Sequence, residues 1–458
     1  MEINLIGGTG QGRNKLQNAN LCQNFFVDVD KEGNASLIGS PGLKEFADTG
    51  HPREVRGGIL YGTKIYMVVG EQFFSVDSSG SATRIFGVLD STYGRVTLAK
   101  VTGQIGIVDE ANYYLWKEST NQLVKQTGLT FTPESIADQD GRFIFNALDS
   151  DTFYISGLND GETIGALDYA SAEASPDYTR TIVSDHRELW HFGDESIEPF
   201  YNSGNADFPF ERVSGAFIDR GLGAVESVAP VDNSLMWLDN LFQVVRANGY
   251  VPQTISTPDI AYQIAKCTTK TDAIGYPYTL ENHYFYTLVF PTDGKCFVYD
   301  AATQLWHTRT SGADDSRHRG NMSLLFGGNW IIGDYKNGKL YTYDLDTHTD
   351  NSEVMVSRRR ARVRSKGRKL MRHSRLELEI ETGVGLYTGQ GSDPKVMMRF
   401  SDDNGRTWSN ERWRDIGKMG KTKTRVRWNQ LGASRDRLYE FTITDPVKRH
   451  ITGAYLNE

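Results

Sequence analysis

The sequence predicts an all-β protein, in which a β-propeller of six or seven blades is followed by a C-terminal β-sandwich. Three observations predict this fold: a β-hairpin pattern that recurs about every 40 to 55 residues, a change in charge near residue 350, and a hairpin-turn motif at 401–408. They divide the chain into an N-terminal segment (1–54), the propeller (55–350) and a basic sandwich (351–458).

The repeated hairpin is the main evidence for the propeller. Each copy has an aromatic or β-branched strand and a turn of Gly, Asn, Asp or Ser, and three copies also show a return strand, which is typical of a hairpin with one buried face. The copies lie at 73–85, 113–124, 153–161, 197–205, 242–249, 296–306 and 337–344. A large sandwich or a β-helix also has many short strands, but a closed ring protects the edges of all copies at once.

The first 54 residues are expected to support the ring. Residues 24–28 and 35–39 are predicted strands around a turn at 31–34, and such a segment can add a strand to a blade and close the ring. The glycines at 7–12 follow no apolar strand and do not have the spacing of a nucleotide-binding loop.

One helix is predicted between two blades. Thr257 is a suitable N-cap, Pro258 fits the first turn, and Ile260 and Ile264 form an apolar stripe. We expect this helix to pack on one rim of the propeller without a function of its own.

Charge separates the two halves of the chain. Residues 351–458 hold 24 Lys and Arg against 13 Asp and Glu, a net charge of +11, and the whole chain has −8, so residues 1–350 carry −19. The densest basic run is 357–375. Its candidate surface for assembly or DNA contains Arg358, Arg360, Arg362, Arg364, Lys366, Arg368 and Lys369. The alternative is that Arg360, Arg362 and Arg364 lie on the exposed face of a strand and meet only water or acidic neighbours.

An Asp-box turn is predicted in the basic part. Ser401, Asp403, Gly405, Thr407 and Trp408 match its pattern, in which the carboxylate accepts turn amides, the glycine takes positive φ and the tryptophan anchors the hairpin in a core. Sialidases and many non-enzymes share this turn, so it predicts structure rather than chemistry.

The search for chemistry predicts no catalytic, cofactor or metal site. Zinc-protease, C-x-x-C and nucleophile-elbow motifs are missing from the sequence, and His186 and His191 are expected on opposite faces of a strand. Asp194, Glu195 and Asp239 are candidate glycosidase carboxylates, but they lie at predicted turns. The three distant cysteines are expected to be free thiols, and neither a signal peptide nor a membrane span is expected.

Several strings, taken in order, resemble the packaged-DNA stabilisation proteins of short-tailed bacteriophages. They lie at 39–43, 55–59, 65–70, 94–99, 107–109, 193–201, 256–258, 299–300 and 305–306. The similarity covers most of the chain, although each string is short.

The resemblance implies a tail hub or nozzle protein. Such proteins form a homohexameric ring below the portal and its adaptor, continue the DNA channel and help to retain the packaged genome. The expected partners are other copies of the chain, the portal-adaptor, a tailspike or tail fibre, a distal needle or plug, and genomic DNA that passes through the lumen without sequence-specific binding. The expected location is the virion tail, after folding in the host cytoplasm.

Two other functions are open at this point. A glycan-binding or glycan-cleaving propeller would use Trp190, Trp237 and Trp330 as sugar platforms, although their alternation with apolar residues favours a core position. A general propeller scaffold for protein partners is the third.

Overall fold

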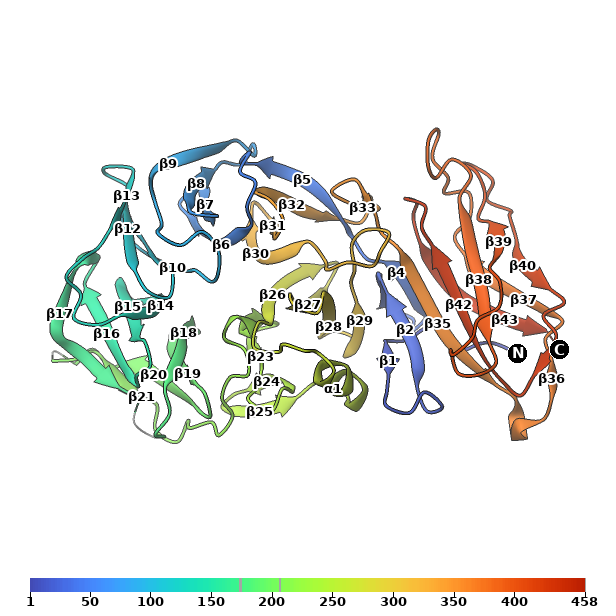
Figure 1. Cartoon of the computed structure of the whole chain (residues 1–458), viewed down its shortest axis with the longest axis horizontal. Coiled ribbons are helices and arrows are strands. Elements are labelled where there is room, and N and C mark those ends of the chain that lie inside the picture. Colours follow the sequence, from blue (N-terminus) through green and yellow to red (C-terminus); the bar gives the residue numbers. More distant parts are fainter. Residues whose placement is uncertain (173–174, 206, 458) are drawn as a thin grey trace.

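The computed structural model describes residues 1–172, 175–205 and 207–457, and these residues form a seven-bladed propeller beside a β-sandwich (Figure 1). Each blade has four antiparallel strands. The first three blades contain β6 (Val55–Tyr61), β7 (Lys64–Val69), β8 (Gln72–Val76) and β9 (Ala82–Val88); β10 (Thr97–Val101), β11 (Gln104–Val108), β12 (Tyr113–Lys117) and β13 (Gln122–Lys125); and β14 (Pro133–Gln139), β15 (Arg142–Ala147), β16 (Thr152–Gly157) and β17 (Asp160–Ser171).

The next three blades follow in chain order around the ring. They contain β18 (Thr179–Asp185), β19 (Glu188–Gly193), β20 (Ile197–Asn202) and β21 (Phe210–Arg212); β22 (Ala229–Val231), β23 (Ser234–Leu238), β24 (Val244–Asn248) and β25 (Val251–Thr254); and β26 (Ile274–Leu280), β27 (His283–Phe290), β28 (Lys295–Asp300) and β29 (Leu305–Thr308).

The N-terminal segment closes the ring. The seventh blade contains β30 (Gly320–Phe326), β31 (Asn329–Asp334) and β32 (Lys339–Asp344), and its fourth strand is β5 (Gly42–Asp48), which pairs antiparallel with β32. The short strands β33 (Thr349–Asp350) and β34 (Glu353–Val354) extend the same sheet. The first and last parts of the propeller sequence are thereby joined by hydrogen bonds.

Each predicted copy contains the third strand of a blade, and the copies at 73–85, 113–124 and 296–306 also contain the fourth. The prediction that one face is buried holds only in part, because the third strands are buried on both faces. In β12, Tyr114 and Trp116 pack toward the first blade, whereas Tyr113 and Leu115 pack toward the third. Blades stack face to face, so the apolar core lies between neighbouring blades rather than beneath one sheet.

A central pocket of about 330 Å³ lies on the propeller axis. It is lined by the first strand of every blade, from β6 to β30, and its charged lining comes from Arg56, Arg95 and Glu226.

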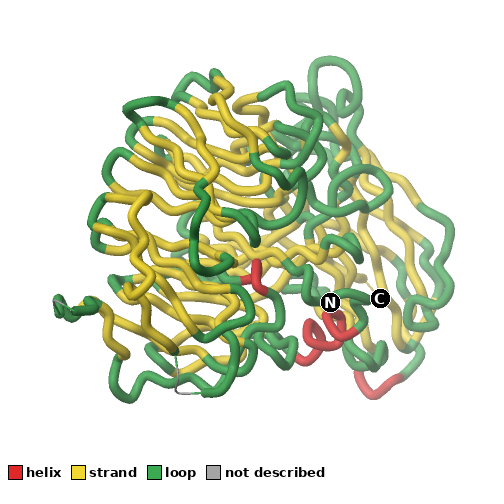
Figure 2. Tube along the Cα trace, turned by 60° about the vertical axis from the view of Figure 1, so that its left-hand side comes forward, coloured by secondary structure: helices red, strands yellow, loops and turns green. Residues whose placement is uncertain are grey.

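The predicted helix is α1 (Pro258–Ala265), between the fifth and sixth blades. Thr257 caps it by accepting a hydrogen bond from the Ile260 backbone N–H at 3.3 Å, and Ile260 and Ile264 are buried between those blades. Short 3₁₀ turns lie at η1 (Val225–Ser227) and η2 (Lys366–Arg368). Figure 2 shows how little of the chain is helical. None of the helices in the described residues has the length and apolar character needed to cross a lipid bilayer.

The sandwich is built from both ends of the chain. One sheet contains β1 (Gly10–Gln11), β2 (Ala19–Gln23), β35 (Ser357–Arg364), β42 (Asp436–Ile443), β38 (Lys395–Ser401) and β39 (Arg412–Asp415). The other contains β3 (Phe25–Val29), β4 (Ala35–Gly39), β43 (His450–Asn457), β37 (Arg375–Ile380) and β40 (Val426–Asn429), and β36 (Met371–Arg372) pairs with β41 (Ala433–Ser434).

Residues 1–54 therefore serve both domains. β5 belongs to the propeller, whereas β1 to β4 belong to the sandwich, whose apolar core includes Ile3, Leu5 and Phe25 together with Trp428 and Phe441. β2 also pairs with β29, so one sheet runs from the sixth blade into the sandwich. The N- and C-termini lie side by side there, and the Met1 ammonium donates to the Leu456 carbonyl at 2.6 Å.

Candidate functional site

The arginine run forms β35, and its alternation separates outward from inward side chains. Arg358, Arg360 and Arg362 are half-buried on the outer face, and Arg364 is exposed. The inward Arg359 is only 1% exposed and donates to the carbonyls of Leu5, Gly8 and Leu21. This residue ties the N-terminal segment to the sandwich.

The centre of the outer face is a cross-strand triad of Arg360, Glu440 and Arg399. The register places Glu440 of β42 opposite Arg360 on one side and opposite Arg399 of β38 on the other. Each arginine donates through Nε to this fully buried carboxylate, at 2.8 and 2.7 Å. The ring of Trp408 lies over both guanidinium groups, with its centroid 5.0 and 4.8 Å from their central carbons.

The other outward arginines also meet acidic neighbours. Arg358 pairs with Asp315 of the loop between the sixth and seventh blades, and Arg362 donates to Asp436 at 2.8 Å. Arg364 lies 3.5 Å from the same Asp436 carboxylate. All four outward arginines of β35 therefore meet acidic neighbours, which is the predicted alternative to DNA binding for Arg360, Arg362 and Arg364.

The end of the run is different. Arg368 and Lys369 are exposed and take part in no ion pair in the described structure, and the side chain of Lys366 lies outside the described part. These two residues are therefore exposed charges of the predicted surface, unpaired among the described residues.

A second group of free bases was missed from the sequence. Lys418, Lys421 and Lys423 lie between β39 and β40, are exposed, and form no ion pair within the described ranges. Arg406 of the preceding turn has the same properties. The repeated lysines at 418–423 were the available signal, but the denser arginine run drew the prediction elsewhere.

The Asp-box turn has the predicted hydrogen bonds. The Asp403 carboxylate accepts from the backbone N–H groups of Arg406 and Thr407 at 2.9 Å and from the Thr407 hydroxyl at 2.6 Å, and these bonds lower its pKa. Ser401 accepts from the Gly405 N–H at 2.8 Å, and Gly405 has a φ of 82°. Trp408 differs from the prediction: it is half-buried on the arginine triad and not in the apolar core.

The candidates for chemistry are engaged in structural contacts, apart from Glu195, whose side chain is exposed and whose backbone N–H donates to Asp177 at 2.8 Å. Trp190 and Trp237 are buried between blades, which removes them as sugar platforms, and Trp330 donates to Thr279 at 2.7 Å. Asp194 pairs with Arg180, and the buried Asp239 pairs with Arg220.

The histidine pair is split by the fold. His186 lies in the turn between β18 and β19, whereas His191 is buried in β19, and burial lowers the His191 pKa to about 3. Within the described residues, no group of three or more His, Cys, Asp or Glu side chains is arranged to hold a metal ion.

Comparison with known protein families gives two consecutive matches. A family model described as Bacteriophage P22 Gp10, beta-propeller, matches residues 1–348, and one described as Bacteriophage P22 Gp10, beta-sandwich, matches residues 357–457. Among curated proteins, none matches the chain in sequence.

Solved structures resemble the chain only distantly. The WD40 β-propeller domain of Doa1 is 14% identical, with a TM-score of 0.41, and the match covers 66% of this chain and 97% of that one. The structure of YCF48 bound to D1 peptide is 11% identical, with a TM-score of 0.42, and the match covers 67% of this chain and 98% of that one.

Proposed function

Because the chain belongs to the bacteriophage P22 Gp10 family of phage tail structural proteins, we propose that it is the hub, or nozzle, of a short phage tail. In this proposal six copies form a ring below the portal-adaptor, continue the DNA channel and retain the packaged genome. The ring anchors tailspikes or fibres and a distal needle or plug. The chain folds in the host cytoplasm and acts without catalysis.

One observation carries the proposal: both family models match in order and together span nearly the whole chain. The described fold supports a rigid building block, since the N-terminal segment supplies strands to the seventh blade and to both sandwich sheets. A subunit whose domains share strands keeps a fixed shape when it joins an assembly.

The charge distribution supports a division of roles. The propeller part is acidic, so it would repel DNA phosphates and let the genome pass without adhering. The free bases of the sandwich, Lys418, Lys421, Lys423, Arg368 and Lys369, would dock on acidic surfaces of neighbouring tail proteins. Replacing Lys418, Lys421 and Lys423 together by Ser distinguishes the reverse orientation, with these bases toward the DNA, because only then would DNA binding change.

The test is a phage whose genome lacks this chain. We expect heads that package DNA and then lose it, measured as DNA protected from nuclease per head, with retention restored when the full chain is supplied in trans. Particles that keep their DNA and infect normally without the chain would contradict the proposal.

A further inference from the structure

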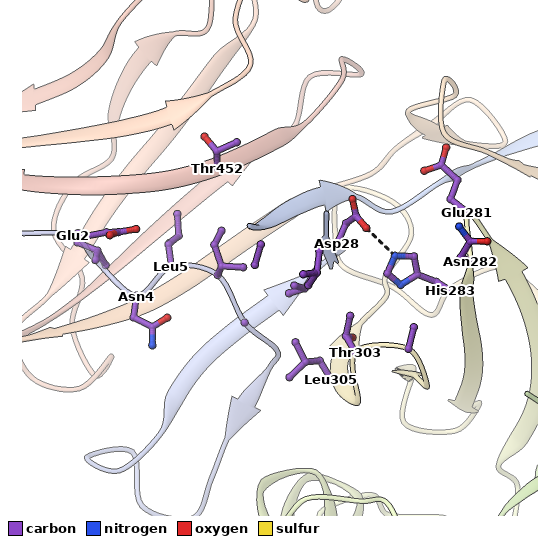
Figure 3. Close-up of a pocket in the computed structure, with 17 residues that line it drawn as sticks. Glu2, Asn4, Leu5, Asp28, Glu281, Asn282, His283, Thr303, Leu305 and Thr452 are labelled. Atoms are coloured by element: carbon purple, nitrogen blue, oxygen red, sulfur yellow. Dashed lines mark hydrogen bonds and ion pairs between the residues drawn. The ribbon is translucent and has the colours of Figure 1, made fainter. Parts of the chain in front are cut away.

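A groove of about 970 Å³ lies between the sixth blade and the sandwich. It is lined by residues 2–7, the β3–β4 hairpin, the turns at 281–283 and 302–305 of the sixth blade, and Thr452 of β43. Figure 3 shows the residues that line the groove.

Every charged side chain along the groove, apart from the histidine His283, is a carboxylate. Figure 3 places Glu2 at one end and Glu281 at the other, with Asp28 between them. No Lys or Arg lines the groove in the part of the chain that the structure describes. Glu2 and Glu281 are exposed and form no ion pair there, so their charges are available to a positively charged group.

Apolar side chains lie between these carboxylates. Val29 is 48% exposed, and Ile6, Ala35 and Leu305 are partly exposed while they pack on the sandwich core. An occupant with apolar side chains would cover this surface and gain the free energy of its burial.

The groove also offers open main-chain groups. Glu2 forms a bridge with Tyr455, but the hydrogen bonds of that bridge are made by Met1 and Ile3, so the Glu2 amide points away from β43. In the described structure, the backbone N–H groups of Glu2, Asn4 and Ile6 donate no hydrogen bond. The Leu5 N–H donates to the Ile3 carbonyl at 2.7 Å, so the segment turns at Asn4, and its free amides can donate to main-chain carbonyls of an extended peptide one at a time.

From this combination we propose that the groove binds an extended segment of a partner protein in which Lys or Arg alternates with apolar residues. The basic groups would meet Glu2 and Glu281, the apolar side chains would cover Val29 and Leu305, and the main chain would pair with the free amides. The inference rests on the groove alone and does not require the proposed tail function.

The binding test uses the full chain and three labelled seven-residue peptides, measured by fluorescence anisotropy. The peptides alternate Lys with Val, Glu with Val, and Lys with Ser. We expect the Lys/Val peptide to bind at least about tenfold more tightly than either of the others, and its affinity to fall with added salt. Equal binding of the Lys/Val and Glu/Val peptides would overturn the proposal.

Variants locate the binding. The double substitution Glu2→Lys with Glu281→Lys should weaken Lys/Val binding about tenfold, and Val29→Gln should weaken it to a smaller extent. The matched control, Asp168→Lys with Asp219→Lys, makes the same charge change at exposed propeller carboxylates outside the groove and should leave binding unchanged. An equal loss in the control would overturn the proposal.

Self-association is the remaining alternative. Sedimentation velocity with and without the Lys/Val peptide tests it, because a second copy seated in the groove would be displaced by the peptide. Oligomers that the peptide dissociates would assign the groove to another copy and contradict the partner assignment. Oligomers that persist with the peptide bound would support the assignment of the groove to a partner protein.

Discussion

The arginines of β35 and the lysines at 418–423 are both dense basic segments of one domain, yet they differ in what they contact. Arg360 and Arg364 lie opposite Glu440 and Asp436 in the strand register. The other two outward arginines pair with acidic residues that are not opposite them: Arg362 with Asp436 and Arg358 with Asp315 of a propeller loop. Lys418, Lys421 and Lys423 lie outside the strands and meet no carboxylate in the described structure. The carboxylates that the fold brings beside each base, and not the density of a charge run, decide which bases are available to a partner.

The largest expected effect is at the centre of the paired group. Glu440→Ala would leave Arg360 and Arg399 without their buried carboxylate, so we expect a loss of about 3 kcal/mol in the free energy of unfolding, measured by urea denaturation. Glu381→Ala, which removes a half-exposed partner of Lys448, is the control and should cost under about 1 kcal/mol. Equal small losses would show that the triad is no stronger than a surface pair.

The Asp-box carboxylate gives a pH-dependent test. The pKa of Asp403 is lowered in the folded state, so its contribution is fully present above the unfolded value of about 3.9 and is lost as the pH falls toward the lowered value. Thermal denaturation of wild type and Asp403→Asn should therefore differ at pH 6 and converge in acid. A difference that stays constant with pH would mean that the charge of Asp403 is not what the turn amides stabilise.

His283, at the junction of the sixth blade and the sandwich, gives a second pH-dependent test of stability. Burial disfavours its protonated form, but hydrogen bonds to Asp300 at 2.8 Å and Asp28 at 3.2 Å outweigh burial and raise its pKa. The resulting stability is fully present below the unfolded value of about 6.5 and is lost as the pH rises through the raised folded value. The melting temperatures of wild type and His283→Gln should therefore differ most below pH 6.5 and approach each other in alkaline buffer.

The smallest expected effect on stability is at the free lysines. Changing Lys418, Lys421 and Lys423 together to Ser should alter the free energy of unfolding by less than about 0.5 kcal/mol, because the side chains are exposed. The same variant should lose affinity for acidic tail proteins while its weak binding to duplex DNA stays as in wild type. A reduced salt dependence of DNA binding, by about 0.9 per lost phosphate contact, would instead place these bases on the DNA.

Much of the fold was predictable because local rules decide it. The alternation and turn residues predicted the third strand of every blade and the fourth strand of three, and Thr257 with its apolar stripe predicted α1. The Asp-box pattern predicted the hydrogen bonds of Asp403, because they lie within a few residues of sequence.

The rest depends on contacts between distant segments. Sequence spacing alone does not show that β5 completes the seventh blade about 290 residues away, or that β1 to β4 join the sandwich. The pairing of Arg360 with Glu440 depends on the register of β35 against β42, which no local pattern records. Trp408 follows from the same register, since it covers the triad that the register creates.

The most direct test of the central claim is cryo-electron microscopy of the virion tail with a label at the C-terminus of this chain. The account predicts six labelled copies in a closed ring below the portal-adaptor, around the DNA channel. Absence of the label from the particle, or its presence only outside the tail axis, would contradict the proposed role as a tail hub.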